Sequence, residues 1–212
     1  MNRALLAIVL ACGGGQRPLV VISTSDPAEY PGVLHDPRTL PRDFMVRQSL
    51  KLDTKANGKR LEAEFDAVVQ KQGDKLLVLG LGPMNMKVFT ITQLGSRIEF
   101  QQYRGPKMPF SPRNIVLDVH RVFFKRLPPP ADAKYSGVLR GELDGEHVEE
   151  TWQGGEVRER VFTRPGSAFR GAVRIALGPG CTGSLCEPET ATIRNEWFDY
   201  TLAIENNGYE TL

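Results

Sequence analysis

The residues of this chain best able to do chemistry are few, and the first of them is Cys12. It follows Val9-Leu10-Ala11, at the end of a short apolar run that begins at Ala4 and that a positive Arg3 precedes. A small residue directly before a cysteine in this setting is typical of a bacterial lipoprotein signal, in which the cysteine becomes the lipidated N-terminus. We therefore expect cleavage after Ala11 and lipidation of Cys12. The alternative is a chance buried cysteine after an ordinary apolar start.

Lipidation of Cys12 would hold the chain at a membrane without inserting it. The apolar run is shorter than the roughly 20 residues that a membrane-spanning helix needs. Two or three acyl chains such as palmitate anchor almost permanently, at roughly 0.8 kcal/mol for each buried methylene. Gly13 stands where Asp favours inner-membrane retention in enteric lipoproteins, so the outer membrane is favoured. The expected organisation is a signal over residues 1–11, a lipidated N-terminus, tether and entry segment over 12–42, and one periplasm-facing domain over 43–212.

The other two cysteines, Cys181 and Cys186, lie in the segment GPGCTGSLCEP. In an oxidising periplasm this pair predicts a local disulfide, which would shape a Gly- and Pro-rich loop more than stabilise the fold. Two thiols without a neighbouring histidine would leave a zinc site half empty, so no metal site is predicted.

No common catalytic motif occurs in the sequence: the G-x-S-x-G elbow, the H-E-x-x-H pair and a Gly-rich phosphate loop with lysine are all missing. His35 is expected to be exposed, His120 to border an apolar helix face with one satisfied nitrogen, and His147 to lie at a solvated strand end. Glu149 and Glu150 are adjacent on a strand, so their carboxylates point to opposite faces. We predict no catalytic residue and no cofactor. An enzyme acting on an envelope lipid, with His120 or His147 as base, is the least supported alternative.

Composition and periodicity indicate one mainly antiparallel β-domain. The net charge of +2 offers no clustered basic excess for a nucleic-acid surface. Apolar and polar residues alternate from Phe44 onward, and Asn57-Gly58 gives a strong signal for a type I′ hairpin turn. Further turns are expected at Gly73-Asp74, Asp144-Gly145 and Gly154-Gly155, and the whole chain gives about ten strands.

One amphipathic helix interrupts this series of strands. Ser111 is expected as its N-cap with Pro112 at the first helical position, and the helix would reach Arg126 before Pro128 stops it. Its apolar face is predicted to carry Ile115, Val116, Val119, Val122 and Phe123. Its polar face is predicted to carry Arg113, Asn114, Asp118, Arg121 and Lys125.

A single helix spanning about 22 Å cannot cover the apolar face of so wide a sheet. We therefore expect the sheet to curl, with the helix as a lid across its concave face. A strongly curved sheet with an incompletely filled interior suits an apolar ligand. The residues expected to line this cavity are Phe65, Phe89, Ile91, Phe100, Val119, Phe123, Trp152, Tyr200 and Leu202. The alternative is that these residues form only a solid core.

Three segments carry a resemblance to a known family: DKLLVLGLGPMNMKVFTITQLGSRIEFQQYRG, SPRNIVLDVHRVFFKRLPP and ATIRNEWFDYTLAIENN. Over about residues 43–205, and in its lipobox, the chain resembles uncharacterised bacterial lipoproteins related to the outer-membrane lipoprotein acceptor LolB and, more distantly, to its soluble carrier LolA. Some members are encoded beside aryl-polyene genes. The resemblance implies a LolA/LolB-like curled antiparallel half-barrel of about ten or eleven strands, plugged by a helix on its concave face, with a cavity that receives acyl chains.

The chain departs from this family in two places. Members usually have a glycine in the turn before the strand that matches Lys87–Thr92, where this chain has Gly82-Pro83-Met84-Asn85. Leu81 and Met84 are the nearest candidates for the protruding apolar loop with which LolB hands lipid to the membrane, and a plain hairpin tip is the alternative. The cysteine loop is an addition to the family pattern.

Taken together, these expectations describe a membrane-anchored envelope lipoprotein that binds or transfers lipid or acyl cargo in an apolar cavity without catalysis. The expected partners are the membrane, a lipid or acyl-chain ligand and a periplasmic carrier protein, and no nucleic acid is expected. The main alternative is a structural or protein-interaction lipoprotein whose core is filled.

Overall fold

The structure is a computed structural model that describes residues 20–22, 30–56, 59–104, 111–166, 170–182 and 185–212. The predicted signal and Cys12 therefore lie outside the described residues. Within these ranges the chain forms fourteen strands of a single sheet, one α-helix and two short 3-10 helices. None of these helices is long and apolar enough to cross a membrane.

The elements follow one another in a simple order along the chain. They are β1 (Val20–Ile22), η1 (Pro37–Thr39), β2 (Phe44–Ala56), β3 (Lys59–Gln72), β4 (Lys75–Leu81), η2 (Pro83–Asn85), β5 (Lys87–Leu94), β6 (Arg97–Gln102), α1 (Pro112–Phe123), β7 (Gly137–Leu143), β8 (Glu146–Gln153), β9 (Glu156–Thr163), β10 (Val173–Leu177), β11 (Cys181–Thr182), β12 (Leu185–Cys186), β13 (Thr190–Asn195) and β14 (Tyr200–Thr211). Eleven of the described strands have five residues or more.

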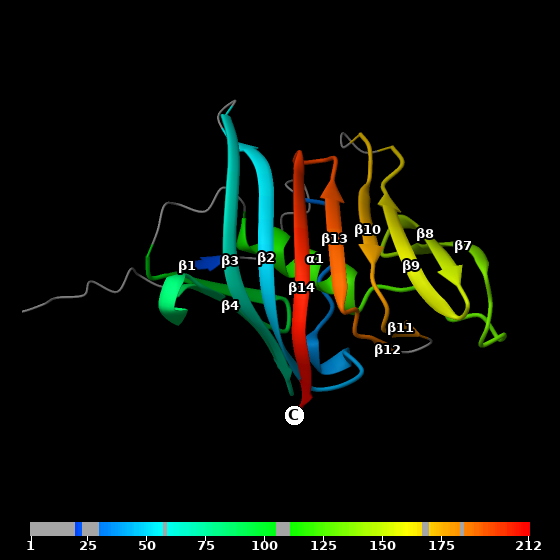
Figure 1. The fold of residues 1–212 in the computed structure, drawn as a ribbon, viewed down its shortest axis with the longest axis horizontal. Helices are drawn as coiled ribbons and strands as arrows, with labels where there is room; N and C mark the ends of the chain where they lie inside the picture. Colours follow the sequence, from blue (N-terminus) through cyan, green and yellow to red (C-terminus); the bar gives the residue numbers. More distant parts are fainter. Residues whose placement is uncertain (1–19, 23–29, 57–58, 105–110, 167–169, 183–184) are drawn as a thin grey trace, which may run out of the picture.

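The sheet is antiparallel throughout and runs in the order β1-β6-β5-β4-β3-β2-β14-β13-β10-β9, with β8 and β7 beyond β9 and the short β11 and β12 beside the end of β9. The long hairpin β2–β3 and the C-terminal strand β14 form its middle (Figure 1). The chain runs from β2 to β6 toward one end of this order, passes through α1 to β7 at the other end, and returns until β14 pairs with β2 in the middle.

The hairpins form where the turn residues predicted them. Asp144 and Gly145 adopt φ of 55° and 75°, and Gly154 and Gly155 adopt 60° and 85°, as a two-residue type I′ turn requires. The Asn57-Gly58 turn lies outside the described residues, but the strands that it joins pair as far as Ala56 and Lys59. The C-terminal region forms β13 and β14, and β14 continues to Thr211.

The helix begins as predicted and ends earlier than predicted. Ser111 stands at the N-cap with extended backbone and Pro112 opens the helix, although no side-chain capping bond forms. The helix ends at Phe123 and not near Arg126, because the amide of Lys125 turns back to the carbonyl of His120, five residues earlier. This bond is typical of a helix C-terminus, and it ends the helix before the prolines are reached.

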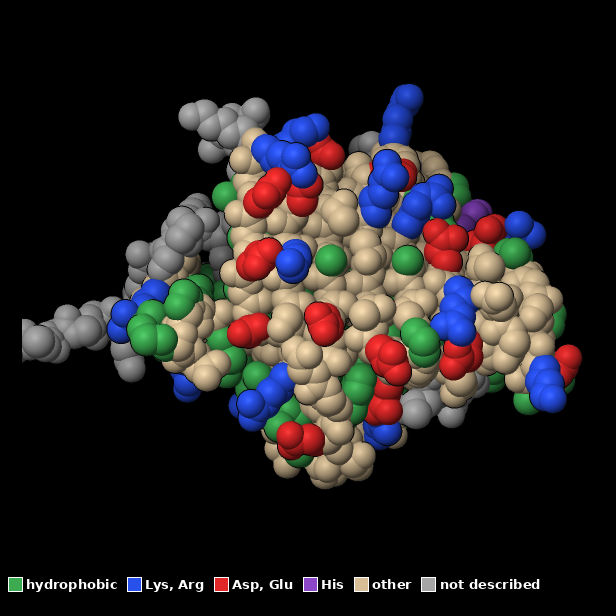
Figure 2. All heavy atoms as spheres, in the orientation of Figure 1, with side chains coloured by type: hydrophobic (Ala, Val, Ile, Leu, Met, Phe, Trp, Pro, Cys, Tyr) green, Lys and Arg blue, Asp and Glu red, His purple; other side chains and the backbone are tan. Residues whose placement is uncertain are grey.

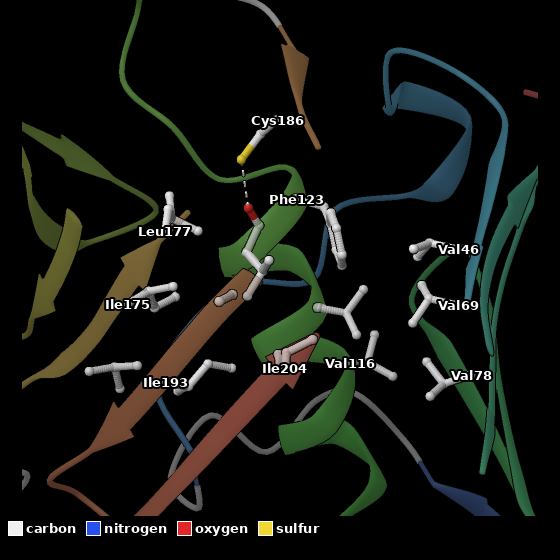
Figure 3. Close-up of a cluster of buried hydrophobic side chains, with 14 of the residues drawn as sticks. Val46, Val69, Val78, Val116, Phe123, Ile175, Leu177, Cys186, Ile193 and Ile204 are labelled. Carbon is white, nitrogen blue, oxygen red and sulfur yellow. Dashed lines mark hydrogen bonds between the residues drawn. The ribbon is translucent and has the colours of Figure 1, made fainter. Parts of the chain in front are cut away.

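The sheet curls around α1 without closing into a barrel, which confirms the predicted fold class. At one end of the strand order His120 of the helix contacts Gln93 of β5, and at the other Arg160 of β9 reaches the helix carbonyls of Arg121 and Val122. Figure 1 shows α1 behind the row β2, β14 and β13. In Figure 3, Val116 of the helix lies between the two groups of core side chains, Val69 and Val78 on one side and Ile175 and Ile193 on the other.

The opposite face of the sheet is polar. Positively charged lysines and arginines and negatively charged carboxylates are scattered over it, with few apolar side chains among them (Figure 2). The pair of Lys51 and Glu64, each with 73% of its side chain exposed, joins β2 to β3 on this face. One buried and one solvated face account for the period-two alternation of the sequence.

The described residues before β2 pack against the domain. Val20–Ile22 pairs with β6, which was not predicted. Tyr30 is fully buried, with its ring edge-on to Trp197 and Phe198. Two arginines of the helix also hold this segment: Arg113 donates to the carbonyls of Tyr30 and Gly32, and Arg121 donates to that of Pro31. Residues 30–32 therefore strap across the helix and cover the face that the sheet does not reach.

Candidate ligand site

An apolar pocket lies between α1 and the inner face of β2 to β5, β13 and β14, with a volume of about 90 Å³. Fourteen of its eighteen lining residues are aliphatic or carry a phenyl ring, and the other four are Gln48, Asn114, Asp118 and Tyr200. The apolar set is Leu50, Leu52, Phe65, Ala67, Val69, Val78, Phe89, Ile115, Val119, Val122, Phe123, Ile193, Leu202 and Ile204. A largely apolar lining with a few polar groups is the usual character of a small-molecule site.

Alternation along the strands delivers most of these side chains to the pocket. Ala67 and Val69 on β3 point inward, and Leu202 and Ile204 do the same on β14. On β4, a Cβ at Gly80 would collide with the ring of Phe89, so this glycine lets the phenyl group lie across its strand. The sheet side of the pocket is thus built from inward-facing positions of six neighbouring strands.

Six of the nine predicted cavity residues line this pocket, namely Phe65, Phe89, Val119, Phe123, Tyr200 and Leu202. The other three do not. Ile91 is fully buried in the core, and Trp152 lies on β8 at the far end of the strand order. Phe100 on β6 is half-buried and packs at 6.5 Å from the ring of Phe89, so it supports the lining from behind.

The main correction concerns the polar side of the helix. Arg113, Asn114, Asp118, Arg121 and Lys125, expected on an exposed face, are all buried, with exposed fractions of 7% or less. The reason is the strap at residues 30–32 together with the hairpin of β7 and β8, which pack over this face and supply partners for its charges. The helix is therefore enclosed on all sides, and Asn114 and Asp118 belong to the pocket wall.

Asp118 is the centre of a buried hydrogen-bond cluster. It accepts a bond of 2.6 Å from the hydroxyl of Tyr30 and a second bond from the hydroxyl of Tyr200. Asn195 donates to both tyrosine oxygens, and Arg121 lies 3.4 Å from the same carboxylate. Burial raises the pKa of the Asp118 carboxyl above its usual range, against the lowering effect of Arg121 and the two tyrosines. Burial likewise raises the pKa of both tyrosines, so they stay protonated donors.

A chain of ion pairs continues from this cluster to the surface. Arg121 donates to Glu146 over 2.8 Å and to the carbonyl of Pro31 over 2.6 Å. Lys125 lies 3.2 Å from Glu146 and 3.0 Å from Asp144. Each of these cations pairs with a carboxylate or donates to a carbonyl of another element, so the cluster fixes the helix, the strap and β8 to one another.

The three histidines do not converge. His120 is fully buried, not at a border as expected, and its Nε2 lies 2.8 Å from Oε1 of Gln93. Since the amide of Gln93 donates to two carbonyls, its oxygen must accept, and Nε2 of His120 carries the proton. His35 is partly exposed and pairs with Asp144 at 2.7 Å, while His147 is exposed on β8. Among the described residues no group of His, Cys, Asp and Glu could hold a metal ion.

Leu81 and Met84 lie beside the pocket and not in its wall. Met84 is 87% exposed in the turn after β4, and both it and Asn85 adopt positive φ, at 58° and 57°. Leu81 is half-buried at the end of β4. A surface groove next to this turn shares Leu50 and Phe65 with the pocket. The turn therefore stands at an edge of the pocket.

The predicted disulfide forms between Cys181 and Cys186, which pair β11 with β12. The Sγ of Cys186 lies 3.3 Å from the carbonyl oxygen of Val122, near the end of α1 (Figure 3). Because a disulfide sulfur has no proton to donate, this is a packing contact. It places the cysteine loop against the C-terminal end of the helix.

Comparison with known proteins gives a family and a set of similar folds. No curated protein matches the chain. A LolA superfamily protein from Nitrosomonas europaea has a TM-score of 0.43 at 9% identity, covering 89% of this chain and 90% of that chain. An outer membrane lipoprotein-sorting protein domain from Vibrio parahaemolyticus has a TM-score of 0.39 at 9% identity, with coverages of 80% and 85%. A DUF1329 family protein from Desulfovibrio piger has a TM-score of 0.38 at 10% identity, with coverages of 82% and 87%.

The sequence itself matches one family model over residues 45–207, which span β2 to most of β14. That model describes a protein of unknown function, DUF3261, so the expectation of an uncharacterised family is confirmed. The match includes the strands and the helix that form the pocket. The chain therefore belongs to the DUF3261 family.

Proposed function

We propose that this protein binds an acyl chain or a similar apolar ligand beneath α1 and passes it on without chemical change. The observation that carries the proposal is the wall of the pocket, in which fourteen of eighteen lining residues are aliphatic or phenyl and come from both helix and sheet. Leaving apolar volume unfilled costs stability, at roughly 24 cal/mol for each Å³. A protein that keeps such a volume has a reason to use it.

The pocket must enlarge to admit a chain. Its volume of about 90 Å³ is smaller than the roughly 150 Å³ of an engineered cavity that binds benzene. The sheet is held by continuous strand pairing, whereas α1 is attached by side chains, so we place the required opening on the helix side of the pocket, where it works against the buried ion pairs that hold α1. In this proposal Pro112–Phe123 acts as the lid, and an entering chain replaces contacts that Val119, Val122 and Phe123 make with the sheet.

The proposed route of entry and release is the edge of the pocket near the turn after β4. Leu50 and Phe65 are shared between the pocket and the groove beside this turn, and Met84 projects from it into solvent. An exposed methionine is suited to transient contact with a lipid surface because its side chain is flexible and apolar. Leu81 and Met84 would then touch the membrane during transfer.

We further propose that lipidated Cys12, after removal of residues 1–11, keeps the domain at the periplasmic side of the outer membrane. The support is the sequence pattern around Cys12. A periplasmic carrier that delivers the cargo is part of the same proposal. A short tether of this kind keeps the pocket within reach of the bilayer.

Two neighbouring substitutions on β3 test the proposed binding. Ala67 is buried and lines the pocket, whereas Val68 is half-buried on the opposite face of the same strand. Ala67→Phe should fill the pocket, and Val68→Phe is its matched control because successive side chains alternate between faces. The readout is the fluorescence of N-phenyl-1-naphthylamine, a neutral apolar dye, with folding checked by circular dichroism.

Wild type and Val68→Phe should bind the dye with similar affinity, and Ala67→Phe should bind at least tenfold more weakly while remaining folded. Equal binding by all three folded proteins would place the dye elsewhere and overturn the proposal.

The small volume of the pocket favours one other function, that of a structural or interaction lipoprotein with a filled core. The same experiment separates the two. A folded wild-type protein that binds no dye at all would support the filled core and remove the basis for ligand transfer.

A further inference from the structure

The polar end of the pocket is formed by two helix residues on one face of α1, Asn114 and Asp118, four positions apart. Both are 7% exposed and both line the pocket. We infer that the pocket selects alkyl or acyl chains whose head group is uncharged and donates a hydrogen bond, such as a hydroxyl or a carboxamide. It discriminates against carboxylates and other anions. This inference rests on the proposed function and names its ligand class.

Asn114 is the group that calls for such a partner. Its Oδ1 is buried and has no hydrogen-bond partner among the described residues. A buried amide oxygen without a partner costs about 1–3 kcal/mol, so native proteins rarely keep one without a use. The surrounding wall is apolar apart from Gln48, Asp118 and Tyr200. A ligand head group that donates a hydrogen bond is therefore the partner that fits this oxygen.

Asp118 makes this end of the pocket unfavourable for anionic head groups. Its carboxylate oxygens are already occupied by the hydroxyls of Tyr30 and Tyr200. If it is ionised it repels an anionic head group at short range, and if it is protonated it still supplies no positive charge. In neither state does this end of the pocket stabilise a carboxylate.

No cation compensates for an anion at this place. None of the described residues that line the pocket is a lysine or an arginine. The arginines of the helix already have partners. Arg121 pairs with Asp118 and Glu146 and donates to a backbone carbonyl, and Arg113 donates to two carbonyls of the strap. Gln48, the remaining amide of the wall, donates to Asn206. An anionic head group would thus be buried without a partner, which is strongly unfavourable.

Three ligands with the same chain length test this selectivity on the wild-type protein. Dodecanol, dodecanamide and dodecanoate are titrated against bound N-phenyl-1-naphthylamine at pH 8, where dodecanoate is ionised. Dodecanol and dodecanamide should each displace the dye with at least tenfold higher affinity than dodecanoate. Equal or tighter binding of dodecanoate would overturn the inference and leave the proposed function standing, whereas failure of all three ligands to displace the dye would overturn the proposed function itself.

A substitution then assigns the selectivity to the helix. Asn114→Leu keeps the size of the side chain and removes its hydrogen bonds, so dodecanol should bind about fivefold more weakly. Asn207→Leu, at an exposed position on β14, is the matched control and should bind dodecanol like wild type. Unchanged dodecanol affinity in a folded Asn114→Leu protein would overturn the assignment to Asn114. The comparison of the three ligands needs no variant and stays decisive if Asn114→Leu fails to fold.

Discussion

Arg160 and Glu150 face each other across the β8–β9 hairpin with 2.9 Å between Nε and Oε1, and both side chains are buried. Arg160 also donates through Nη1 to the carbonyl of Val122, over 2.8 Å, at the C-terminal end of α1. One side chain therefore bonds an oxygen of a buried carboxylate and a carbonyl at the helix end. The pair links the lid to a strand on the far side of the sheet.

Replacing Arg160 with Met should destabilise the protein severely. Met keeps much of the length of the side chain but leaves Glu150 as a buried charge without its partner, a loss of about 3–5 kcal/mol. Arg140→Met on the neighbouring β7–β8 hairpin is the control, because Arg140 pairs with Glu149 at the surface, where exposed ion pairs contribute about 1 kcal/mol or less. Urea unfolding measures both. Similar losses for the two variants would mean that the buried pair does not hold the helix end.

Buried His120 should make stability depend on pH. Burial, helped by the positive charges of His35 and Lys125, lowers the pKa of His120 from 6.5 to about 3. Between these values the unfolded chain binds a proton that the folded protein does not. The free energy of unfolding should therefore fall as the pH drops through this window, by up to about 1.4 kcal/mol for each pH unit.

The substitution His120→Gln should flatten this dependence between pH 6.5 and 4.5, measured by urea unfolding at a series of pH values. Carboxylates with lowered pKa, such as Asp43 and Asp144, lose their contribution at lower pH, and the raised pKa of Asp118 acts with the opposite sign. These groups are present in both proteins, so the difference reports His120. Exposed His147→Gln is the control and should keep the wild-type slope. If His120→Gln keeps it as well, His120 is not held neutral.

The strap should depend on the hydroxyl of Tyr30. In Tyr30→Phe the ring still packs on Trp197, but Asp118 loses one of its two tyrosine donors and Asn195 loses one of its acceptors. The expected cost is about 1–3 kcal/mol. Tyr103→Phe, which removes a partly exposed bond to Gln101, should cost clearly less. Thermal unfolding compares the two, and equal small losses would argue against a strap fixed through Asp118.

The sequence was a good guide to strands and a poor guide to the helix environment. Type I′ turns at Asp144-Gly145 and Gly154-Gly155 placed the hairpins correctly because the positive φ that they need is a local property. The burial of Arg113 and Arg121 is not local. It depends on the strap and on β8, which are remote in the chain, and an amphipathic pattern shows only which face is apolar.

The same limit applies to the pocket. Alternation predicts which side of a strand faces inward, and this was enough to find Phe65 and Leu202. It does not indicate which inward residues meet one another, so Ile91 and Trp152 were included although they pack elsewhere. Asn114 was missed because a polar residue on an amphipathic helix ordinarily faces water.

Methyl NMR with a spin-labelled ligand tests the central claim most directly. A dodecanamide that carries a nitroxide at the end of its chain is titrated into protein with labelled Leu, Val and Ile methyl groups. If the chain enters beneath α1, the methyl signals of Val119, Leu202 and Ile204 should broaden saturably, and those of Val138, which is 39% exposed on β7, should not. Broadening of Val138 with Val119 and Leu202 unchanged would contradict a ligand pocket beneath the helix.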